Sequence, residues 1–182
     1  VSEAFRKGIF EAVSIATTTG FTAAEYANWP TFIPFLLLMS AFIGACAGST
    51  GGGIKIIRMV LLYKQGSREI KRLIHPNAVI PIKLGKKPVG SRVIEAVWGF
   101  LAAYVLIFAG LMLVCMALGE DPITAYSSVG ACLNNLGPGL GDATLNYSTL
   151  SDGTKYVLSF AMLLGRLELF TLLVVLSPSF WE

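Results

Sequence analysis

The sequence Ala16-Thr17-Thr18-Thr19-Gly20-Phe21 interrupts a strongly apolar chain with a short polar run that closes on glycine. A second run of the same kind is Leu133-Asn134-Asn135-Leu136-Gly137-Pro138. In a membrane, backbone that is not helical is tolerated only where it is buried in protein or lines a water-filled path, because lipid cannot hydrogen-bond peptide groups. Two such interruptions in one chain predict an ion pathway.

The composition favours a membrane protein. Of the 182 residues, 54% are hydrophobic and 14% are charged, and the mean hydropathy is +0.69. Cys46, Cys115 and Cys132 have no paired spacing and no histidine cluster nearby, so neither a disulfide framework nor a zinc site is predicted. The chain begins at Val1 without a basic signal region, which leads us to expect an internal fragment.

Three apolar stretches are long enough to cross a bilayer or to enter it. Residues 93 to 118 predict one helix that crosses a hydrocarbon core of roughly 30 Å. Residues 154 to 178 predict a second, with Arg166 and Glu168 in its middle. Residues 30 to 63 are interrupted by a glycine-rich run, so we expect two half-helices joined by a loop within the membrane, because glycine disfavours helix.

The distribution of charge predicts the topology. Ten of the fourteen basic residues lie between positions 55 and 92, against the single acid Glu69, so this linker is expected in the cytoplasm. Short helices are expected at residues 3 to 15 and 122 to 132, each dipping in from outside and ending at a polar run. Asp121 and Pro122 are a good start signal for the second. The C-terminal ends of both helix dipoles would favour a cation inside the membrane.

The two glycines that close the polar runs, Gly20 and Gly137, are 117 positions apart, and the same offset sets residues 3 to 15 against residues 120 to 132. Gly44 corresponds to Gly165 if the second connecting loop is a few residues longer. The predicted fold class is therefore an all-α membrane protein. Its repeats each contain an outer helix, a re-entrant pore helix with a filter loop, and an inner helix, as in potassium channels.

Three parts are expected along the chain. Residues 1–64 hold the pore helix, filter and glycine-interrupted inner helix of one repeat. Residues 65–92 form the basic cytoplasmic linker, and residues 93–182 form a complete second repeat.

At these motifs the chain resembles the TrkH/KtrB family of bacterial potassium uptake proteins, and most of all its TrkH branch. The matching stretches are residues 14–21, 44–55, 134–139 and 165–171. The resemblance implies four repeats around one pore, of which this chain holds the third without its first helix and the whole of the fourth. It also implies a multi-pass protein of the bacterial inner membrane that acts with the remaining repeats, as a homodimer, in contact with membrane lipid and with a cytosolic nucleotide-binding regulatory subunit of TrkA type. Nucleic acid is not an expected partner.

The candidate ion-binding groups are backbone carbonyls of the two polar runs, which would replace the hydration shell of a potassium ion. These carbonyls belong to Thr17, Thr18, Thr19, Gly20, Asn134, Asn135, Leu136 and Gly137, with Thr18, Thr19, Asn135 and Leu136 expected to hold the ion directly. Potassium is the transported substrate, and no cofactor is expected. Each run has one glycine where strongly selective potassium channels have two, which predicts weaker discrimination against sodium. The plainer interpretation of either run is a helix cap followed by an ordinary loop.

The candidate gate consists of Gly48, Ser49, Thr50, Gly51, Gly52, Gly53 and Arg166. The resemblance implies that the glycine loop obstructs the pore below the filter and that the arginine lies beside it as an electrostatic barrier. A mid-span cation is costly in lipid, so Arg166 is expected to face the pore or the loop carbonyls. The alternatives are a kink required by helix packing and an intramembrane pair with Glu168.

Five acidic residues are expected on the outer side of the membrane. They would either concentrate cations at the outer mouth of the pore or be ordinary solvated loop residues. They are Glu25, Glu120, Asp121, Asp142 and Asp152. An enzyme is not expected, because no acid, base, nucleophile or metal set converges within the apolar stretches. A sodium-coupled or weakly selective cation transporter is the nearest alternative function, followed by an intramembrane enzyme and a membrane scaffold without transport.

Overall fold

The computed structural model describes residues 2–30, 32–44, 46, 52–78, 80–144, 146–167, 169–177, 180 and 181. The described chain is mainly helical, which confirms the predicted class, apart from a hairpin with two residues in each strand. In chain order the elements are α1 Ser2–Ala16, η1 Tyr26–Asn28, α2 Phe32–Ile43, α3 Ile56–Ile74, β1 Lys83–Leu84, β2 Lys87–Pro88, α4 Ser91–Ala117, α5 Pro122–Leu133, η2 Gly141–Ala143, α6 Asp152–Arg166 and α7 Leu169–Leu176.

The two short helices before the polar runs, α1 and α5, form where the sequence predicts them. At the start of α5 the Asp121 carboxylate accepts a hydrogen bond of 3.0 Å from the Ile123 backbone N–H. Pro122 occupies the first turn, where its missing N–H leaves no helical bond unmade. This predicted start signal is confirmed.

The glycine-rich stretch separates α2 from α3, as expected. Gly44 and Gly53 adopt φ of +49° and +83°, and the Ile54 N–H donates to the Phe42 carbonyl across 2.9 Å, so the chain returns to the end of α2 before α3 begins. The linker predicted from residue 65 begins within a helix. Helix α3 continues to Ile74, because the charged stretch is amphipathic and Glu69 pairs with Arg72 one turn later at 3.5 Å.

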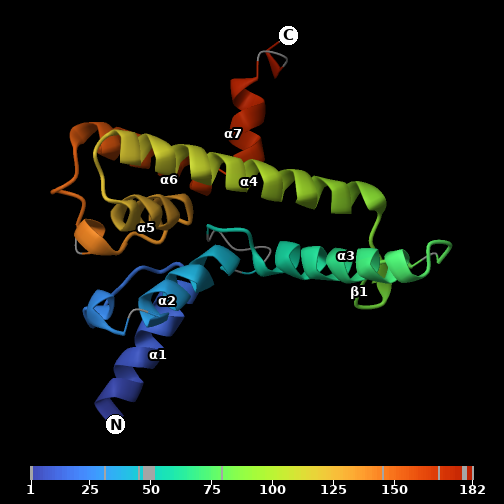
Figure 1. Ribbon diagram of the computed structural model, residues 1–182, viewed down its shortest axis with the longest axis horizontal. Helices are drawn as coiled ribbons and strands as arrows, with labels where there is room; N and C mark the ends of the chain where they lie inside the picture. Colours follow the sequence, from blue (N-terminus) through green and yellow to red (C-terminus); the bar gives the residue numbers. More distant parts are fainter. Residues whose placement is uncertain are drawn as a thin grey trace.

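Helix α4 is the one helix in the described ranges that is both long and apolar enough to cross a membrane. The prediction of a single helix over residues 154 to 178 is wrong, because α6 ends at Arg166 and α7 begins at Leu169. Figure 1 shows α6 lying beside α4 and α7 turning away from both. The break lets α7 pack on α4: Leu169 is buried, and the Phe170 ring meets the Phe100 ring edge to face at 5.8 Å.

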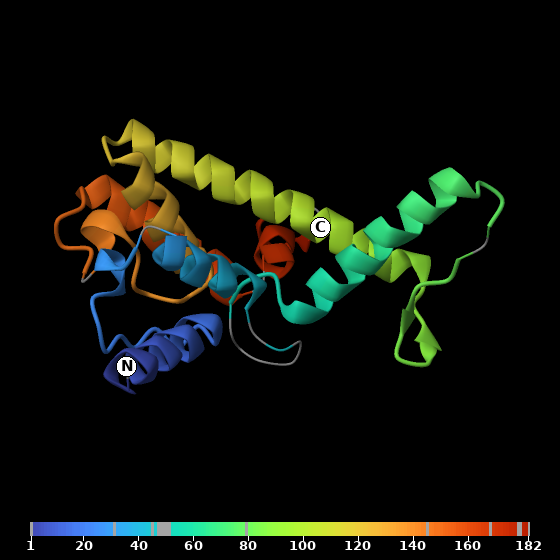
Figure 2. The same ribbon diagram turned by 60° about the horizontal axis from the view of Figure 1, so that its bottom comes forward.

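Helix α5 is the centre of the fold, since α2, α4 and α6 all pack against it. Its residues 124, 125 and 127–133 are all buried. An aromatic cluster closes the α2–α4–α5 junction, with the Phe108 ring 5.5 Å from both Phe42 and Tyr126. Helix α1, by contrast, packs mainly on α2 and lies apart from α4, as Figure 2 also shows. The second repeat therefore encloses its short helix, whereas in the first repeat only one side of α1 is covered.

Candidate functional site

The two polar runs have the same backbone conformation. Thr18 and Asn135, neither of which is glycine, adopt left-handed φ of 55° and 54°, and two residues later Gly20 and Gly137 adopt φ of 82° and 102°. Left-handed backbone is unfavourable for residues other than glycine, so its appearance at the same place in both runs indicates a required shape. The repeat predicted from the sequence is thus present in the backbone.

The hydrogen bonds of the two runs also match at the offset of 117 residues. In each run three successive N–H groups donate back to carbonyls of the preceding helix, and the second and third of these bonds form the Schellman pattern with which many helices end. In the first run the bonds are Thr17 to Val13, Thr18 to Ile15 and Thr19 to Ser14, and in the second they are Asn134 to Gly130, Asn135 to Cys132 and Leu136 to Ala131. All six distances lie between 2.8 and 3.1 Å.

The two runs lie side by side. A Cβ atom added to Gly20 would overlap the Leu136 carbonyl oxygen, 3.2 Å from the carbonyl carbon and 3.4 Å from Cδ of Pro138. A Cβ on Gly137 would have no neighbour within 4 Å among the described residues. Backbone groups of the first run therefore contact backbone groups of the second, as expected for segments that surround a shared axis.

Glu11, in the middle of α1, holds the chain just beyond the first run. Its side chain is fully buried, and Oε1 accepts hydrogen bonds from the N–H groups of Ala23 at 2.6 Å and Ala24 at 3.0 Å. In the second repeat the Ser127 hydroxyl likewise holds the chain beyond the run, because it accepts a hydrogen bond of 2.9 Å from the Leu140 N–H. Glu11 belongs to none of the motifs that the sequence indicates, although a carboxylate in a short helix expected to enter the membrane is a usable signal.

Two tyrosines donate hydrogen bonds to backbone carbonyls at and just beyond the end of the second run. The Tyr26 hydroxyl donates to the Gly139 carbonyl at 2.9 Å, and the Tyr147 hydroxyl donates to the Gly137 carbonyl. Burial, with a smaller contribution from the Glu11 carboxylate, raises the pKa of Tyr26 to about 12, so this hydroxyl remains a donor at neutral pH. The Gly137 carbonyl thus already accepts a side-chain hydrogen bond.

Asn134 anchors the start of the second run to the long helix α4. The residue is fully buried, and its Oδ1 accepts a hydrogen bond of 2.7 Å from the Tyr104 hydroxyl. Tyr104 itself is buried against Phe100 and Phe42. The side chain of Asn134 therefore fixes position, while its carbonyl belongs to the predicted filter.

The described part of the predicted gate lies directly against the second run. A Cβ on Gly52 would overlap the Asn134 carbonyl and come within 2.8 Å of its Cα, and one on Gly53 would lie 3.3 Å from Asn134 Oδ1. Two backbones approach here so closely that only glycine fits. Gly48, Ser49, Thr50 and Gly51 lie outside the described residues.

Arg166 is the last residue of α6 and its side chain is exposed. Gly165 just before it packs under the second run, since a Cβ there would overlap the Leu133 carbonyl and lie 2.6 Å from Asn135 Nδ2. Arg166 therefore lies at the end of α6, directly after a residue that packs against the start of this run. Glu168, the alternative partner, lies outside the described residues.

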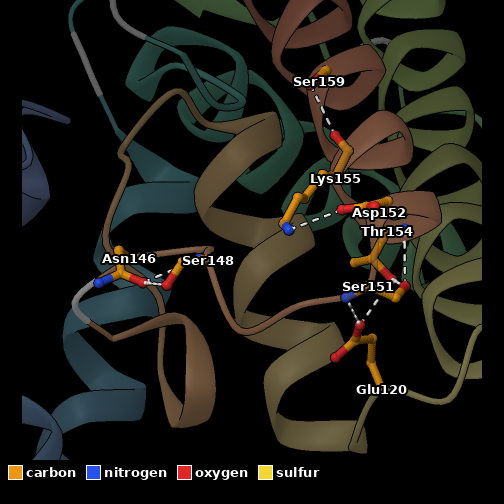
Figure 3. A network of polar contacts seen from close by, with 8 residues as sticks. All are labelled: Glu120, Asn146, Ser148, Ser151, Asp152, Thr154, Lys155 and Ser159. Carbon is orange, nitrogen blue, oxygen red and sulfur yellow. Dashed lines mark hydrogen bonds and ion pairs between the residues drawn. The ribbon is translucent and has the colours of Figure 1, made fainter.

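Several of the outer acids have structural partners. Figure 3 shows Glu120 between the ends of two helices, where its Oε1 accepts from the Ser151 N–H at 3.1 Å and from the Thr154 hydroxyl at 2.9 Å. Asp152 pairs with Lys155 at 3.0 Å in the same view. Glu120 thus holds the start of α6 against the turn before α5, whereas the Asp152–Lys155 pair lies within α6 itself. Among the described residues no group of three histidine, cysteine or acidic side chains could hold a metal ion.

The family model TrkH, described as a cation transport protein, matches residues 1–182. A Trk system potassium uptake protein TrkH from Vibrio parahaemolyticus is 55% identical over 180 residues, which are 99% of this chain and 37% of that protein. The protein of the same name from Escherichia coli K12 is 56% identical over 97% of this chain and 36% of its own length.

A more distant relative and a solved structure are consistent with the same family. The potassium uptake protein TrkG of Escherichia coli K12 is 39% identical over 98% of this chain and 37% of its own length. The crystal structure of the potassium transporter TrkH from Vibrio parahaemolyticus superposes with a TM-score of 0.92 at 54% identity, covering 100% of this chain and 39% of that one. The chain thus spans little more than a third of the length of the relatives it matches.

Proposed function

Because the chain belongs to the TrkH family of cation transport proteins, we propose that it supplies two adjacent filter segments of a potassium-uptake pore. The ion is potassium, held as transported substrate by the carbonyls of Thr18, Thr19, Asn135 and Leu136, with Thr17, Gly20, Asn134 and Gly137 completing the two runs. The relatives are transport proteins, and we infer that this chain performs no enzymatic reaction.

One observation carries this proposal: two loops of matching backbone conformation and matching hydrogen bonds lie in contact at the ends of two short helices. Such loops direct successive carbonyls to one side, and rings of carbonyls are the means by which potassium pores replace water around the ion. A helix cap accounts for these hydrogen bonds in either run taken alone, but it gives no reason for the contact between Gly20 of one run and Leu136 of the other.

The gate is the glycine loop from Gly48 to Gly53 together with Arg166. The contact of Gly52 with the Asn134 carbonyl supports a loop that lies under the filter. The position of Arg166 directly after Gly165, which packs on Leu133, supports a positive charge at the inner end of the ion path. A cation leaving the filter would meet that charge.

The partners we propose complete the transporter. The remaining repeats of the longer protein close the pore, a second copy forms a homodimer, and a cytosolic nucleotide-binding subunit of TrkA type regulates it from the side of α3 and the hairpin. The location we propose is the bacterial inner membrane, which the protein crosses several times.

The function is tested by rubidium uptake into cells that lack their own potassium transporters and express the full-length protein containing this chain. We expect potassium to compete with rubidium more strongly than sodium does, and chloride to have no effect. Uptake that requires a sodium gradient would favour the sodium-coupled alternative. Correctly inserted protein without any rubidium uptake would contradict the proposal.

Replacing Arg166 with alanine in the full-length protein is expected to raise rubidium flux. The increase would be about tenfold if the charge contributes on the order of 1.4 kcal/mol to the barrier. Arg166→Lys keeps the charge and should leave the flux near that of the unmodified protein. Unchanged flux in Arg166→Ala, at normal abundance in the membrane, would show that the arginine is no barrier.

A further inference from the structure

A pocket of about 280 Å³ lies between the second half of α3 and the segment that leads into β1. Its walls carry four cationic side chains, Lys64, Arg68 and Lys71 from α3 and Lys83 from β1. The three residues on α3 are spaced four and three positions apart, so they share one face of the helix. Ser67 and Tyr63, whose side chains carry hydroxyl groups, line the same pocket.

The charge in this pocket is largely uncompensated. Arg68 is paired with Glu69 at 3.2 Å, and the Lys64 ammonium donates to the Lys83 carbonyl at 2.6 Å. Within the part of the chain that the structure describes, no acid lies within ion-pair distance of the Lys71 or Lys83 ammonium. A cavity lined by several cations and hydroxyl donors suits a phosphate group.

The pocket lies beside the first turns of α4, which the proposed orientation places at the depth of the lipid headgroups. Ile82, which lines it, is 4% exposed and packs with Ile94 and Val97 in the first turns of the spanning helix α4. Figure 2 shows the hairpin at the end of the molecule where α4 begins. Trp98, which directly follows Val97, is 46% exposed, as is common for tryptophan at a membrane interface.

A second pocket, apolar and also about 280 Å³, lies next to the first. Ile57 and Val60 of α3 line it together with Leu84 of β1. Lys83 and Leu84 are successive residues of one strand, so their side chains point to opposite faces, one to each pocket. Along α3, Val60 and Ile57 precede Lys64 by about 6 to 10 Å at 1.5 Å per residue, towards the membrane interior.

From this arrangement we propose that the basic pocket binds a phosphate group, and that its source is the headgroup of an anionic phospholipid whose acyl chain occupies the apolar pocket. The inference rests on the proposed membrane orientation and goes beyond ion permeation. Phosphate at Lys71 and Lys83 would fix the cytoplasmic end of α3, the helix that follows the glycine loop. Dissolved phosphate would occupy only the basic pocket, whereas a phospholipid would occupy the basic pocket with its headgroup and the apolar pocket with an acyl chain.

The test is native mass spectrometry of the full-length protein, stripped of lipid in detergent and titrated with phosphatidylglycerol or phosphatidylcholine. The double variant Lys71→Gln with Lys83→Gln is expected to bind phosphatidylglycerol about 25-fold more weakly, at roughly fivefold per cation near a membrane surface. Its binding of phosphatidylcholine should not change. The matched control is Lys86→Gln with Lys87→Gln, which removes two exposed hairpin lysines outside the pocket and should have an effect under about twofold because those charges are screened.

Three results would overturn the proposal. Equal losses in the pocket and control variants would show only a diffuse attraction to anionic lipid. Displacement of phosphatidylglycerol by millimolar inorganic phosphate would assign the pocket to a dissolved anion. Unchanged lipid binding with loss of the TrkA-type subunit would make the pocket a protein contact. Because rubidium uptake can be measured on the same variants, failure of the lipid site is distinguishable from failure of the transport function.

Discussion

Gly20→Ala in the full-length protein is expected to abolish rubidium uptake. The added methyl group would overlap the Leu136 carbonyl oxygen, and alanine at φ of 82° adds strain of about 1–2 kcal/mol. The overlap can be relieved only by moving one run away from the other, which displaces the carbonyls proposed to hold the ion. We expect a loss of roughly 100-fold, the effect that misplacement by an ångström has on a preorganised site.

Gly8→Ala is the matched control for this experiment. Gly8 lies in α1, the same helix that leads into the first run, and no described atom lies within 4 Å of an added Cβ. This variant should keep its uptake, since alanine favours helix. If Gly20→Ala protein is present in the membrane and transports rubidium normally, then the contact between Gly20 and Leu136 has no part in conduction.

Gly165→Ala is expected to prevent stable folding of the second repeat. The methyl group would overlap the Leu133 carbonyl and lie 2.6 Å from Asn135 Nδ2, both groups at the rigid end of the enclosed helix α5. Overpacking commonly costs about 1–3 kcal/mol, and here the obstacle is backbone that no rotamer change can remove, so we expect the upper end or beyond. Thermal unfolding of the purified full-length protein, together with its abundance in the membrane, measures the effect.

Gly110→Ala provides the comparison for Gly165→Ala. Gly110 lies in α4 with no described atom within 4 Å of an added Cβ, so its substitution should leave the unfolding temperature unchanged or slightly raised. An unfolding temperature for Gly165→Ala equal to that of Gly110→Ala would mean that α6 does not press on the second run as closely as described.

Much of the fold follows from local patterns in the sequence. The apolar run from residue 93 predicts α4, the Asp121-Pro122 pair predicts the start of α5, and the glycine-rich stretch predicts the interruption between α2 and α3. The end of α6 and the extent of α3 could not be predicted in the same way. Apolar content continues past Arg166, and only the packing of α7 on Phe100 explains the break there. The charge beyond residue 64 predicts a linker but does not show that the first ten residues of that linker continue helix α3 to Ile74.

The candidate site likewise has features that the sequence predicts and features that only the fold reveals. The sequence by itself determined that two polar, glycine-closed runs recur at one offset after short helices, because repeats and helix signals are local and can be counted along the chain. Only the tertiary structure decided that Gly20 contacts the Leu136 carbonyl, that Glu11 and Tyr104 hold the two runs, and that Gly52 lies against Asn134. Those contacts join residues that are not neighbours in the sequence. Which residues meet depends on how the helices pack around α5, and no local sequence pattern encodes that packing.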